Sequence, residues 1–254
     1  SPVCVTTKVL FTNTSTIGFQ SGCSRYTSWI WNFGDPASGS SNVITTTSSG
    51  TQAAPNASHI FSAPGCYTVS LTANNACTVG MNPTNTFTQQ VIVLPVPIAS
   101  FTIPNYNSLP VCFPYSVTLN NTSNTLTQCD PNLAQYLWQV SYLPDYCGTQ
   151  ANYTPLTSTA VNPTFQFNSA GQYKITLRAT NICGPNTSAE QIITIKKPPT
   201  VTINPISDYC LTGSISPTAA INSCSDITTN NPTYLWTFPG GTPSTSTALS
   251  PANI

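Results

Sequence analysis

An internal repeat, marked by two independent kinds of residue, constrains the fold of this chain more than any other feature. Three tryptophans occur in similar short segments and are separated by 107 and 98 residues: Trp31, Trp138 and Trp236. Three cysteines that follow an apolar residue or a tyrosine are separated by 108 and 98 residues: Cys4, Cys112 and Cys210. Both series share a period of about 100 residues, the size of one β-sandwich domain, so we predict tandem copies of one domain.

The later half of each unit is predicted to contain a long β-strand. Apolar or aromatic residues alternate with polar ones over residues 67–73, and the same alternation recurs over residues 173–179. A period of two places all the apolar side chains on one face of a strand, whereas a helix would scatter them around its circumference. The alternation therefore predicts an all-β fold with one face of each long strand buried.

Two proline-containing segments, at residues 91–103 and 193–203, are predicted to join the copies. Proline has no backbone donor and a fixed φ, so each segment ends one strand and stiffens the start of the next domain. Such short linkers favour a semi-rigid rod over loosely tethered beads. We predict a first copy that lacks its opening strand (1–95), a complete copy (96–197) and the N-terminal part of a third (198–254), all within a longer array.

The composition argues against several classes of function. Charged residues make up 5 % of the chain, with six basic and six acidic side chains, and no basic stripe is present for nucleic-acid phosphates. The longest apolar stretch, residues 91–99, is interrupted by two prolines and is shorter than the ~20 residues of a membrane helix. We therefore expect neither nucleic-acid binding nor membrane insertion.

Ten cysteines in this chain point to disulfide bonds. A zinc site requires closely spaced ligands such as C-x-x-C, and the chain has no such pair and a single histidine. Disulfides persist in oxidising compartments, so we predict an extracellular protein.

Residues 28–38 and 57–77 resemble the polycystic kidney disease (PKD) repeat, whose usual signature is W-D-F-G-D-G followed by H-x-F/Y and G-x-Y-x-V-x-L. The first copy keeps Trp31, Asn32, Phe33, Gly34, Asp35, His59, Phe61, Gly65, Tyr67, Val69 and Leu71. The second keeps Trp138, Phe165, Phe167, Gly171, Tyr173, Ile175 and Leu177, and the third keeps Trp236, Phe238 and Gly240. The resemblance implies immunoglobulin-like sandwiches of seven strands in two sheets.

The resemblance also implies structural roles for the aromatic residues. Trp31, Trp138 and Trp236 are expected in the core. Tyr67 and Tyr173 follow a Gly-x turn and are expected to form a tyrosine corner, in which the phenol bonds nearby backbone. The cysteine-bearing variety of the repeat looks like repeats of giant Bacteroidota surface proteins, including gliding-motility adhesins and other cargo of the type IX secretion system.

The topology of such a sandwich suggests which cysteines lie at the same end of a domain. On this argument Cys23 pairs with Cys77 and Cys129 with Cys183, because both pairs lie in the B–C and F–G loops. The opposite ends are expected to hold Cys4–Cys66 and Cys112–Cys147. The remaining two, Cys210 and Cys224, are expected to bond beyond the fragment, although a bond between them is an open alternative.

Candidate residues for chemistry are few. His59 has no serine or cysteine assigned to it as a nucleophile, and the acidic residues are spread singly. Asp35 is a weak calcium candidate, since a carboxylate among loop carbonyls suits that ion. We therefore expect no enzyme activity and no cofactor.

Two functions compete. The first is a structural and adhesive segment of a long cell-surface filament or stalk, whose partners are neighbouring repeats, surface polysaccharide or other cell-surface proteins. The second is a set of non-catalytic spacer or substrate-docking modules of a secreted glycosidase or protease. A third, weaker hypothesis is a carbohydrate-binding module, which requires a row of exposed aromatic rings.

Overall fold

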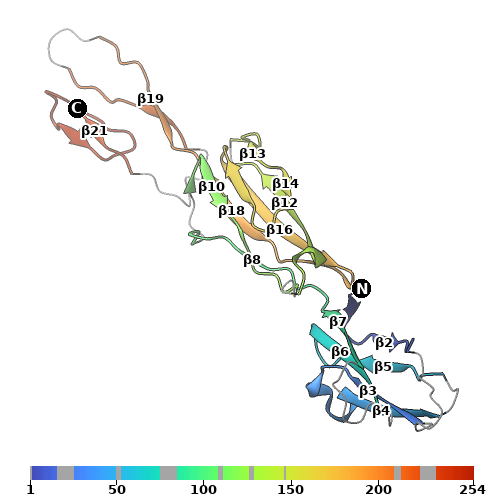
Figure 1. Ribbon diagram of the computed structural model, residues 1–254. Helices are drawn as coiled ribbons and strands as arrows, with labels where there is room; N and C mark the ends of the chain where they lie inside the picture. The colour runs from blue at the N-terminus through green and yellow to red at the C-terminus, as the bar shows by residue number, and fades with distance from the viewer. Residues whose placement is uncertain are drawn as a thin grey trace. The chain divides into compact units, whose positions relative to one another are not determined.

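The computed structural model describes residues 2–15, 26–49, 53–74, 85–107, 111–125, 129–145, 147–208, 213–223 and 233–254. Strands dominate these residues, and the helical segments among them are two short 3-10 helices, η1 (Pro36–Asn42) and η2 (Pro131–Leu133) (Figure 1). Neither is long and apolar enough to span a membrane. The predicted fold class, an all-β chain of tandem immunoglobulin-like sandwiches, is confirmed.

The first copy consists of a large and a small sheet. The large sheet has the order β1-β7-β6-β3-β4, with bounds Val3–Cys4, Thr86–Leu94, Gly65–Asn74, Tyr26–Asn32 and Val43–Ser49. The small sheet pairs β2 (Lys8–Phe11) with β5 (Ala57–Ile60) in antiparallel register. This arrangement gives each long strand one inward and one outward face.

The core of the first copy lies between these two sheets. Trp29 and Trp31 are two residues apart on β3, so they share the inward face, and both are buried. They cluster with Phe11, Phe33, Ala57, Phe61, Val69, Leu71, Val91 and Val93. Because full burial of one large apolar side chain contributes roughly 1.5–3 kcal/mol, this cluster is a principal source of stability.

The second copy repeats the same plan. Its large sheet has the order β14-β12-β16-β18-β9, with bounds Thr157–Ser158, Gln135–Leu143, Gly171–Asn181, Gln191–Lys196 and Val111–Cys112, and β17 (Gly184–Thr187) also pairs with β16. A second sheet has the order β10-β15-β13, with bounds Tyr115–Thr118, Thr164–Phe167 and Tyr153–Thr154. An opening strand, β8 (Phe101–Thr102), pairs with β11 (Asn120–Asn121).

Aromatic rings fill the core of the second copy. Phe167 of β15 and Tyr173 of β16 have no exposed surface, and their ring centroids lie 4.4 Å apart. Trp138 is also fully buried and meets Phe101 of the opening strand edge to face at 5.1 Å. Its indole N–H donates to the carbonyl of Ala160 over 2.9 Å, so the ring is both packed and hydrogen-bonded.

The third copy shows two small antiparallel sheets. β19 (Thr200–Ile203) pairs with β20 (Ala219–Asn222), and β21 (Trp236–Thr237) pairs with β22 (Thr245–Ser246). Trp236 is half-buried and stacks on Phe238 at 6.1 Å. Its indole N–H donates to the carbonyl of Ala248 over 3.0 Å, which repeats the bond made by Trp138.

The cysteine that opens each of the first two copies has the same backbone environment. β1 runs parallel to the end of β7, with Cys4 opposite Leu94. β9 runs parallel to the end of β18, with Cys112 opposite Lys196. Cys4 and Cys112, two of the cysteines that reveal the repeat, therefore occupy equivalent positions in the two copies.

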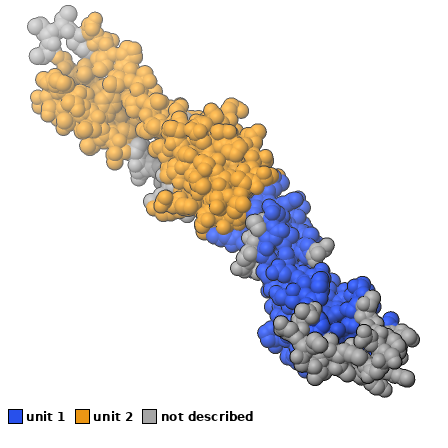
Figure 2. Space-filling view, in the orientation of Figure 1, with its two compact units in different colours: residues 1–100, 122–137, 177–188 blue, residues 101–121, 138–176, 189–254 orange. Residues whose placement is uncertain are grey.

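The described chain divides into two compact units, coloured in Figure 2. The first contains residues 1–100, 122–137 and 177–188, and the second contains residues 101–121, 138–176 and 189–254. The first sandwich thus shares a unit with two segments of the second copy. Each of those two segments contains a cysteine, Cys129 in one and Cys183 in the other.

Candidate functional site

The PKD-like signature of the first copy forms a tight turn that carries Asp35 into the core. Gly34 has a φ of +67°, and a Cβ there would lie 2.5 Å from the carbonyl oxygen of Thr68. Only glycine therefore fits this position without displacing the backbone. The side-chain oxygen of Asn32 accepts a hydrogen bond from the Gly34 N–H over 2.9 Å and closes the turn.

Asp35 is the centre of a buried polar cluster. Its Oδ2 lies 3.0 Å from Nε2 of His59 and accepts the backbone N–H of Ser62 over 2.8 Å. Its Oδ1 accepts the hydroxyl of Ser62 over 2.5 Å. The side chains of Asp35 and His59 are each 2 % exposed, and the imidazole stacks on Phe33 at 4.3 Å.

Two opposing effects act on the ionisation of Asp35. Burial, the largest single influence, raises the pKa of a carboxyl group. Hydrogen bonds from the Ser62 hydroxyl, His59 and the Ser62 amide, with the attraction of His59, favour the carboxylate and together outweigh burial. The pKa of Asp35 is therefore held below its ordinary value of 3.8.

This cluster does not have the geometry of a catalytic triad. In a triad the histidine lies between the nucleophile and the carboxylate, whereas here the carboxylate lies between Ser62 and His59. The Ser62 hydroxyl donates to Asp35 and is not activated by the imidazole. The arrangement therefore fits a structural role, in which the three side chains join the turn at Asp35 to the segment after β5.

The calcium prediction for Asp35 does not fit this geometry. Both carboxylate oxygens face protein N–H and O–H donors, whereas calcium requires six to eight converging oxygen ligands. Across the described ranges, no group of three or more His, Cys, Asp and Glu side chains could hold a metal ion. Asp35 is better explained as a buried hydrogen-bond acceptor.

Of the aromatic side chains that the structure describes, Phe87 alone is exposed, at 68 %. A groove of about 680 Å³ on the first sandwich is lined by this ring and by apolar residues that include Phe11, Trp31 and Val91. A sugar-binding platform requires several exposed rings in a row. The described surface therefore does not favour a carbohydrate-binding module.

The predicted tyrosine corners have matching geometry in both copies. The phenol of Tyr67 donates to the carbonyl of Ala63 over 2.6 Å, and that of Tyr173 donates to the carbonyl of Ser169 over 2.9 Å. Each bond spans four residues and fastens the turn that precedes a long strand. Tyr67 is half-buried and Tyr173 fully buried, and burial raises the pKa of the Tyr173 phenol.

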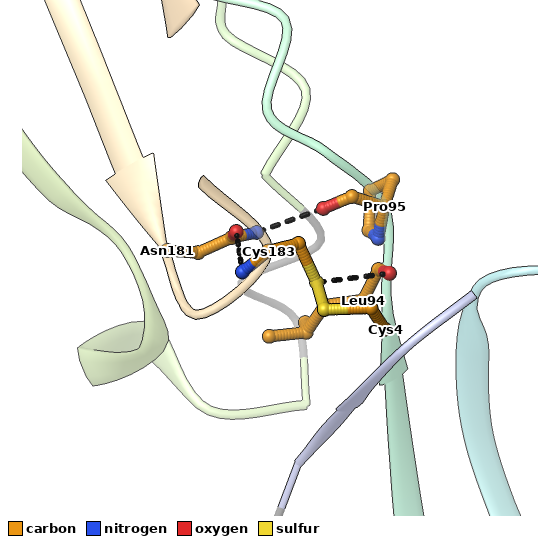
Figure 3. The surroundings of a disulfide bond; sticks show 5 residues. All are labelled: Cys4, Leu94, Pro95, Asn181 and Cys183. Atoms are coloured by element: carbon orange, nitrogen blue, oxygen red, sulfur yellow. Dashed lines mark hydrogen bonds between the residues drawn. A yellow bond between two sulfur atoms is a disulfide. The ribbon is translucent and has the colours of Figure 1, made fainter. Parts of the chain in front are cut away.

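The strongest candidate site is a joint at which disulfides connect the first copy to the second. Cys4 of β1 is bonded to Cys183, which lies in the turn between β16 and β17, with Cα atoms 5.5 Å apart (Figure 3). Cys66 of β6 is bonded to Cys129, which directly precedes the Asp130 cap of η2, with Cα atoms 6.0 Å apart. All four cysteines belong to the first compact unit.

Asparagine side chains hold the joint together around the first of these bridges. The Oδ1 of Asn181 accepts the Cys183 N–H over 2.8 Å and shapes the turn, while its Nδ2 donates to the Pro95 carbonyl over 2.9 Å (Figure 3). Asn186 accepts the backbone N–H of Ala99 over 2.9 Å. The linker after β7 is thus hydrogen-bonded to the same turn that carries Cys183.

These bonds correct three of the predicted pairs. Cys4–Cys66 and Cys129–Cys183 are wrong, because Cys4 bonds Cys183 and Cys66 bonds Cys129. Cys112–Cys147 is also wrong, since Cys112 has a free, exposed thiol while Cys147 is disulfide-bonded. The prediction placed each pair at the same end of a domain. It assumed that both partners belong to one copy, whereas the partners of Cys4 and Cys66 lie in loops of the adjoining copy.

Four cysteines of the prediction lie outside the described residues. The predicted Cys23–Cys77 pair falls there, as do Cys210 and Cys224 themselves. The N-x-C segment near the end of the long strand, at 75–77 and at 181–183, marks the cysteine-bearing repeats in the sequence, but sequence reasoning gave Asn181 itself no role.

Known proteins resemble the chain in part. Residues 3–82 match the family model of the PKD domain. No curated protein shows a significant match to the chain. The PKD match covers most of the first copy and, with the all-β architecture, supports a PKD- and immunoglobulin-like repeat protein.

Similar solved structures include the D00-D0 domain of intimin, with 13 % identity, a TM-score of 0.39 and coverage of 75 % of this chain and 94 % of that chain. The titin I-band fragment I67–I69 has 12 % identity, a TM-score of 0.34 and coverage of 92 % and 74 %. Extracellular domains 3–5 of Drosophila OTK have 13 % identity, a TM-score of 0.26 and coverage of 87 % and 71 %.

Proposed function

We propose that this chain is a structural and adhesive segment of a long cell-surface filament or stalk. The observation that carries the proposal is the joint with two disulfides, Cys4–Cys183 and Cys66–Cys129. Domains joined by a short linker alone move relative to each other by default. Two covalent bonds at separate points oppose such a hinge, and they suit a chain whose task is reach and mechanical persistence.

The composition supports the same role outside the cell. With 5 % charged residues and no net charge, the surface depends on uncharged polar side chains, whose hydration does not vary with the ionic strength of the surroundings. Disulfides are stable in oxidising compartments. We extend the proposal to three domains at residues 1–95, 96–197 and 198–254, arranged as a semi-rigid rod.

The alternative is that the repeats space or dock the catalytic domain of a secreted glycosidase or protease. PKD- and immunoglobulin-like domains are generally non-catalytic, which agrees with both proposals. The hydroxyl of the Asp35 cluster, that of Ser62, donates to the carboxylate and is not in contact with His59 as a nucleophile would be with its base. The two functions differ in location, since a stalk stays on the cell and a secreted enzyme leaves it.

Immuno-electron microscopy of the producing cells, with antibodies against residues 1–95, tests the proposal. We expect gold label outside the cell envelope on intact cells, and loss of the label after external protease treatment. Label confined to the culture medium, together with a catalytic domain in the same open reading frame, would establish the alternative. Glycan-array binding of the purified segment identifies any polysaccharide partner.

We further propose, from the resemblance of the cysteine-bearing repeats, a Bacteroidota-type gliding-motility adhesin or other type IX secretion cargo. The test is deletion of an essential component of that secretion system in the producing organism. Surface label should then disappear while the protein accumulates inside the envelope. Unchanged surface label would contradict this assignment and leave the stalk role intact.

A further inference from the structure

We propose that a groove on the first sandwich accepts one extended β-strand of a separate polypeptide. The strand would lie in the place that the segment 98–102, which contains β8, takes in the second copy. The groove has a volume of about 680 Å³ and is lined in part by side chains of β2 and β7. Its lining also includes Thr12, Thr14 and Ser15, which directly follow β2. The inference goes beyond the stalk proposal and does not depend on it.

In the second copy, the segment 98–102 is held through its main chain. β8 pairs with β11 in antiparallel register. The carbonyl of Ser100 accepts the N–H of Thr122 over 2.9 Å and the hydroxyl of Ser123 over 3.2 Å. The Ser123 hydroxyl in turn accepts the Ser100 N–H over 3.1 Å. Such main-chain hydrogen bonds provide the affinity when a β-sheet takes up an added strand.

Phe101 supplies the side-chain contact of this segment. Its ring is buried and meets Trp138 edge to face at 5.1 Å. The side-chain amide of Gln191 on β18 donates to the Phe101 carbonyl over 2.6 Å. Ala99 is also buried, whereas the residues on either side of Phe101 are exposed. The segment therefore alternates between buried and exposed residues, with an aromatic ring at the position that meets the tryptophan.

The first copy has the same polar residues after β2. The repeat offset of 108 residues, found for the opening cysteines, also separates Thr14 from Thr122 and Ser15 from Ser123. Thr14 and Ser15 are exposed and line the groove. The groove therefore presents the two residue types that bond Ser100 in the second copy.

The groove also presents a glutamine and a tryptophan in the corresponding places. Gln89 of β7 lies opposite Val69 of β6. In the same way, Gln191 of β18 lies opposite Ile175 of β16, which has the place of Val69 in the alternating pattern. Gln89 lines the groove, and so does Trp31, the equivalent tryptophan of the repeat. An aromatic residue of an incoming strand would thus meet an indole and a side-chain amide, as Phe101 does.

The first copy leaves this place uncovered in the part of the chain that the structure describes. Residues 12–15 belong to no sheet, whereas their counterparts in the second copy include β11. Leu10 and Phe87 line the groove and are each 68 % exposed. The indole N–H of Trp31 is buried and has no hydrogen-bond partner among the described residues. A strand in the groove would cover apolar surface and bring main-chain carbonyls close to the buried donor, and both changes favour binding.

The chemistry of the groove favours a strand without charged side chains. Each residue that lines it is apolar or is a threonine, serine or glutamine. Residues 98–102 have a suitable pattern, but they are already engaged in the second copy. The occupant is therefore assigned to a separate polypeptide. Its binding segment is extended and uncharged, with alternate apolar residues that include an aromatic ring.

Fluorescence polarisation with a synthetic peptide tests the proposal on the chain of residues 1–254. The probe has the sequence of residues 97–103, with fluorescein at its N-terminus and an amide at its C-terminus. We expect saturable binding of one peptide per chain. A peptide with Phe101→Ala is the matched control and should bind about tenfold more weakly, because it lacks the ring that would meet Trp31.

Two further measurements locate the peptide on the protein. Gln89→Ala should weaken binding by about three- to tenfold, through loss of one side-chain hydrogen bond to the strand. Gln139→Ala, which changes an exposed glutamine of β12 in the second copy, is the matched control and should leave binding unchanged. A peptide with p-benzoylphenylalanine in place of Phe101 should form photo-cross-links to the segments that contain Trp31 or Phe87, as identified by mass spectrometry.

Three outcomes would overturn the inference. One is the absence of saturable binding, or equal binding of the peptide and its Phe101→Ala form. Another is a set of cross-links that lies outside the groove. The third is binding by residues 1–254 but not by the full natural protein, because the groove would then be filled from the same polypeptide. None of these outcomes bears on surface display, so the stalk proposal is tested separately.

Discussion

Asp35 is a buried charged residue whose three donors come from only two residues, His59 and Ser62. A carboxylate removed from water is tolerated only if its lone pairs are satisfied, because an unpaired buried charge is costly. The hydrogen bonds of the cluster therefore offset the cost of burying the Asp35 carboxylate and link the turn after β3 to the segment after β5. This contact joins the G-D and H-x-F segments of the first copy.

Asp35→Asn should destabilise the first sandwich. The amide keeps the shape of the carboxylate but cannot accept at both positions, so at least one buried donor loses its partner. We expect a loss of about 1–3 kcal/mol in the free energy of unfolding, measured by urea denaturation. Asp208→Asn is the matched control, because Asp208 is exposed, and it should change stability by less than about 0.5 kcal/mol. Equal effects of the two variants would contradict the structural role.

The lowered pKa of Asp35 predicts a contribution to acid stability. A carboxyl group whose pKa is lower in the folded than in the unfolded state stabilises the fold above its unfolded pKa, near 3.8. That stabilisation is lost as the pH falls through the lower folded value. The difference in unfolding free energy between wild type and Asp35→Asn should thus be constant above about pH 5 and shrink towards pH 2. A difference that grew on acidification would show that the sign of the pKa shift is wrong.

At the level of single elements, the long strand β16 begins at a residue that only glycine can occupy. Gly171 has a φ of +142°, which L side chains rarely adopt. A Cβ there would also overlap the ring of Tyr142 and lie 2.7 Å from the carbonyl oxygen of Leu143. Tyr173, which forms the tyrosine corner, follows two residues later. The turn before β16, the close contact with β12 and the start of β16 therefore all depend on this glycine.

Gly171→Ala should therefore destabilise the protein more than alanine at a glycine in the ordinary left-handed region. Gly148 is the matched control, since its φ is +65° and a Cβ there would meet no atom within 4 Å. We expect a loss of about 1 kcal/mol for Gly148→Ala, from backbone strain alone. Gly171→Ala should lose about 2–4 kcal/mol, because overlap with neighbouring atoms adds to the strain. Thermal denaturation of both variants decides the question, and similar losses would contradict the close approach.

At the level of the whole molecule, covalent bonds cross from one copy to the next. The bridges span 179 and 63 residues of sequence, and bonds that close such long loops restrict the unfolded chain strongly. Loop-closure entropy assigns each about 4–5 kcal/mol, with nested loops adding less than the sum. The copies are thus coupled in stability as well as in position.

Removal of one bridge should loosen the joint while leaving the sandwich cores folded. In Cys4→Ser/Cys183→Ser, the Ala99 N–H that donates to Asn186 should lose protection in hydrogen exchange by at least tenfold. Amides of β6 that pair with β7 should change far less, because the bridge joins this sheet only at its edge strand β1 and the pairing of β6 with β7 lies within the sheet. Cys112→Ser is the control and should leave the protection of Ala99 unchanged, since Cys112 has a free thiol. Unchanged protection in the double variant would show that the bridge does not hold the linker.

Sequence alone was sufficient for the features that depend on local periodicity. The alternation of apolar and polar residues predicts the strand β16 and the burial of Leu177. The spacing of Trp31 and Trp138 predicts that they occupy equivalent positions in two copies. Both patterns can be read from the sequence because each is a property of one strand or one repeated unit. The sequence also indicates at which end of a domain a cysteine lies. The tertiary structure alone decides which cysteines bond, because Cys4 can reach Cys183 only where two copies meet. The reason is that strand patterns specify the faces of a domain, while contacts between domains depend on how their loops come together in space.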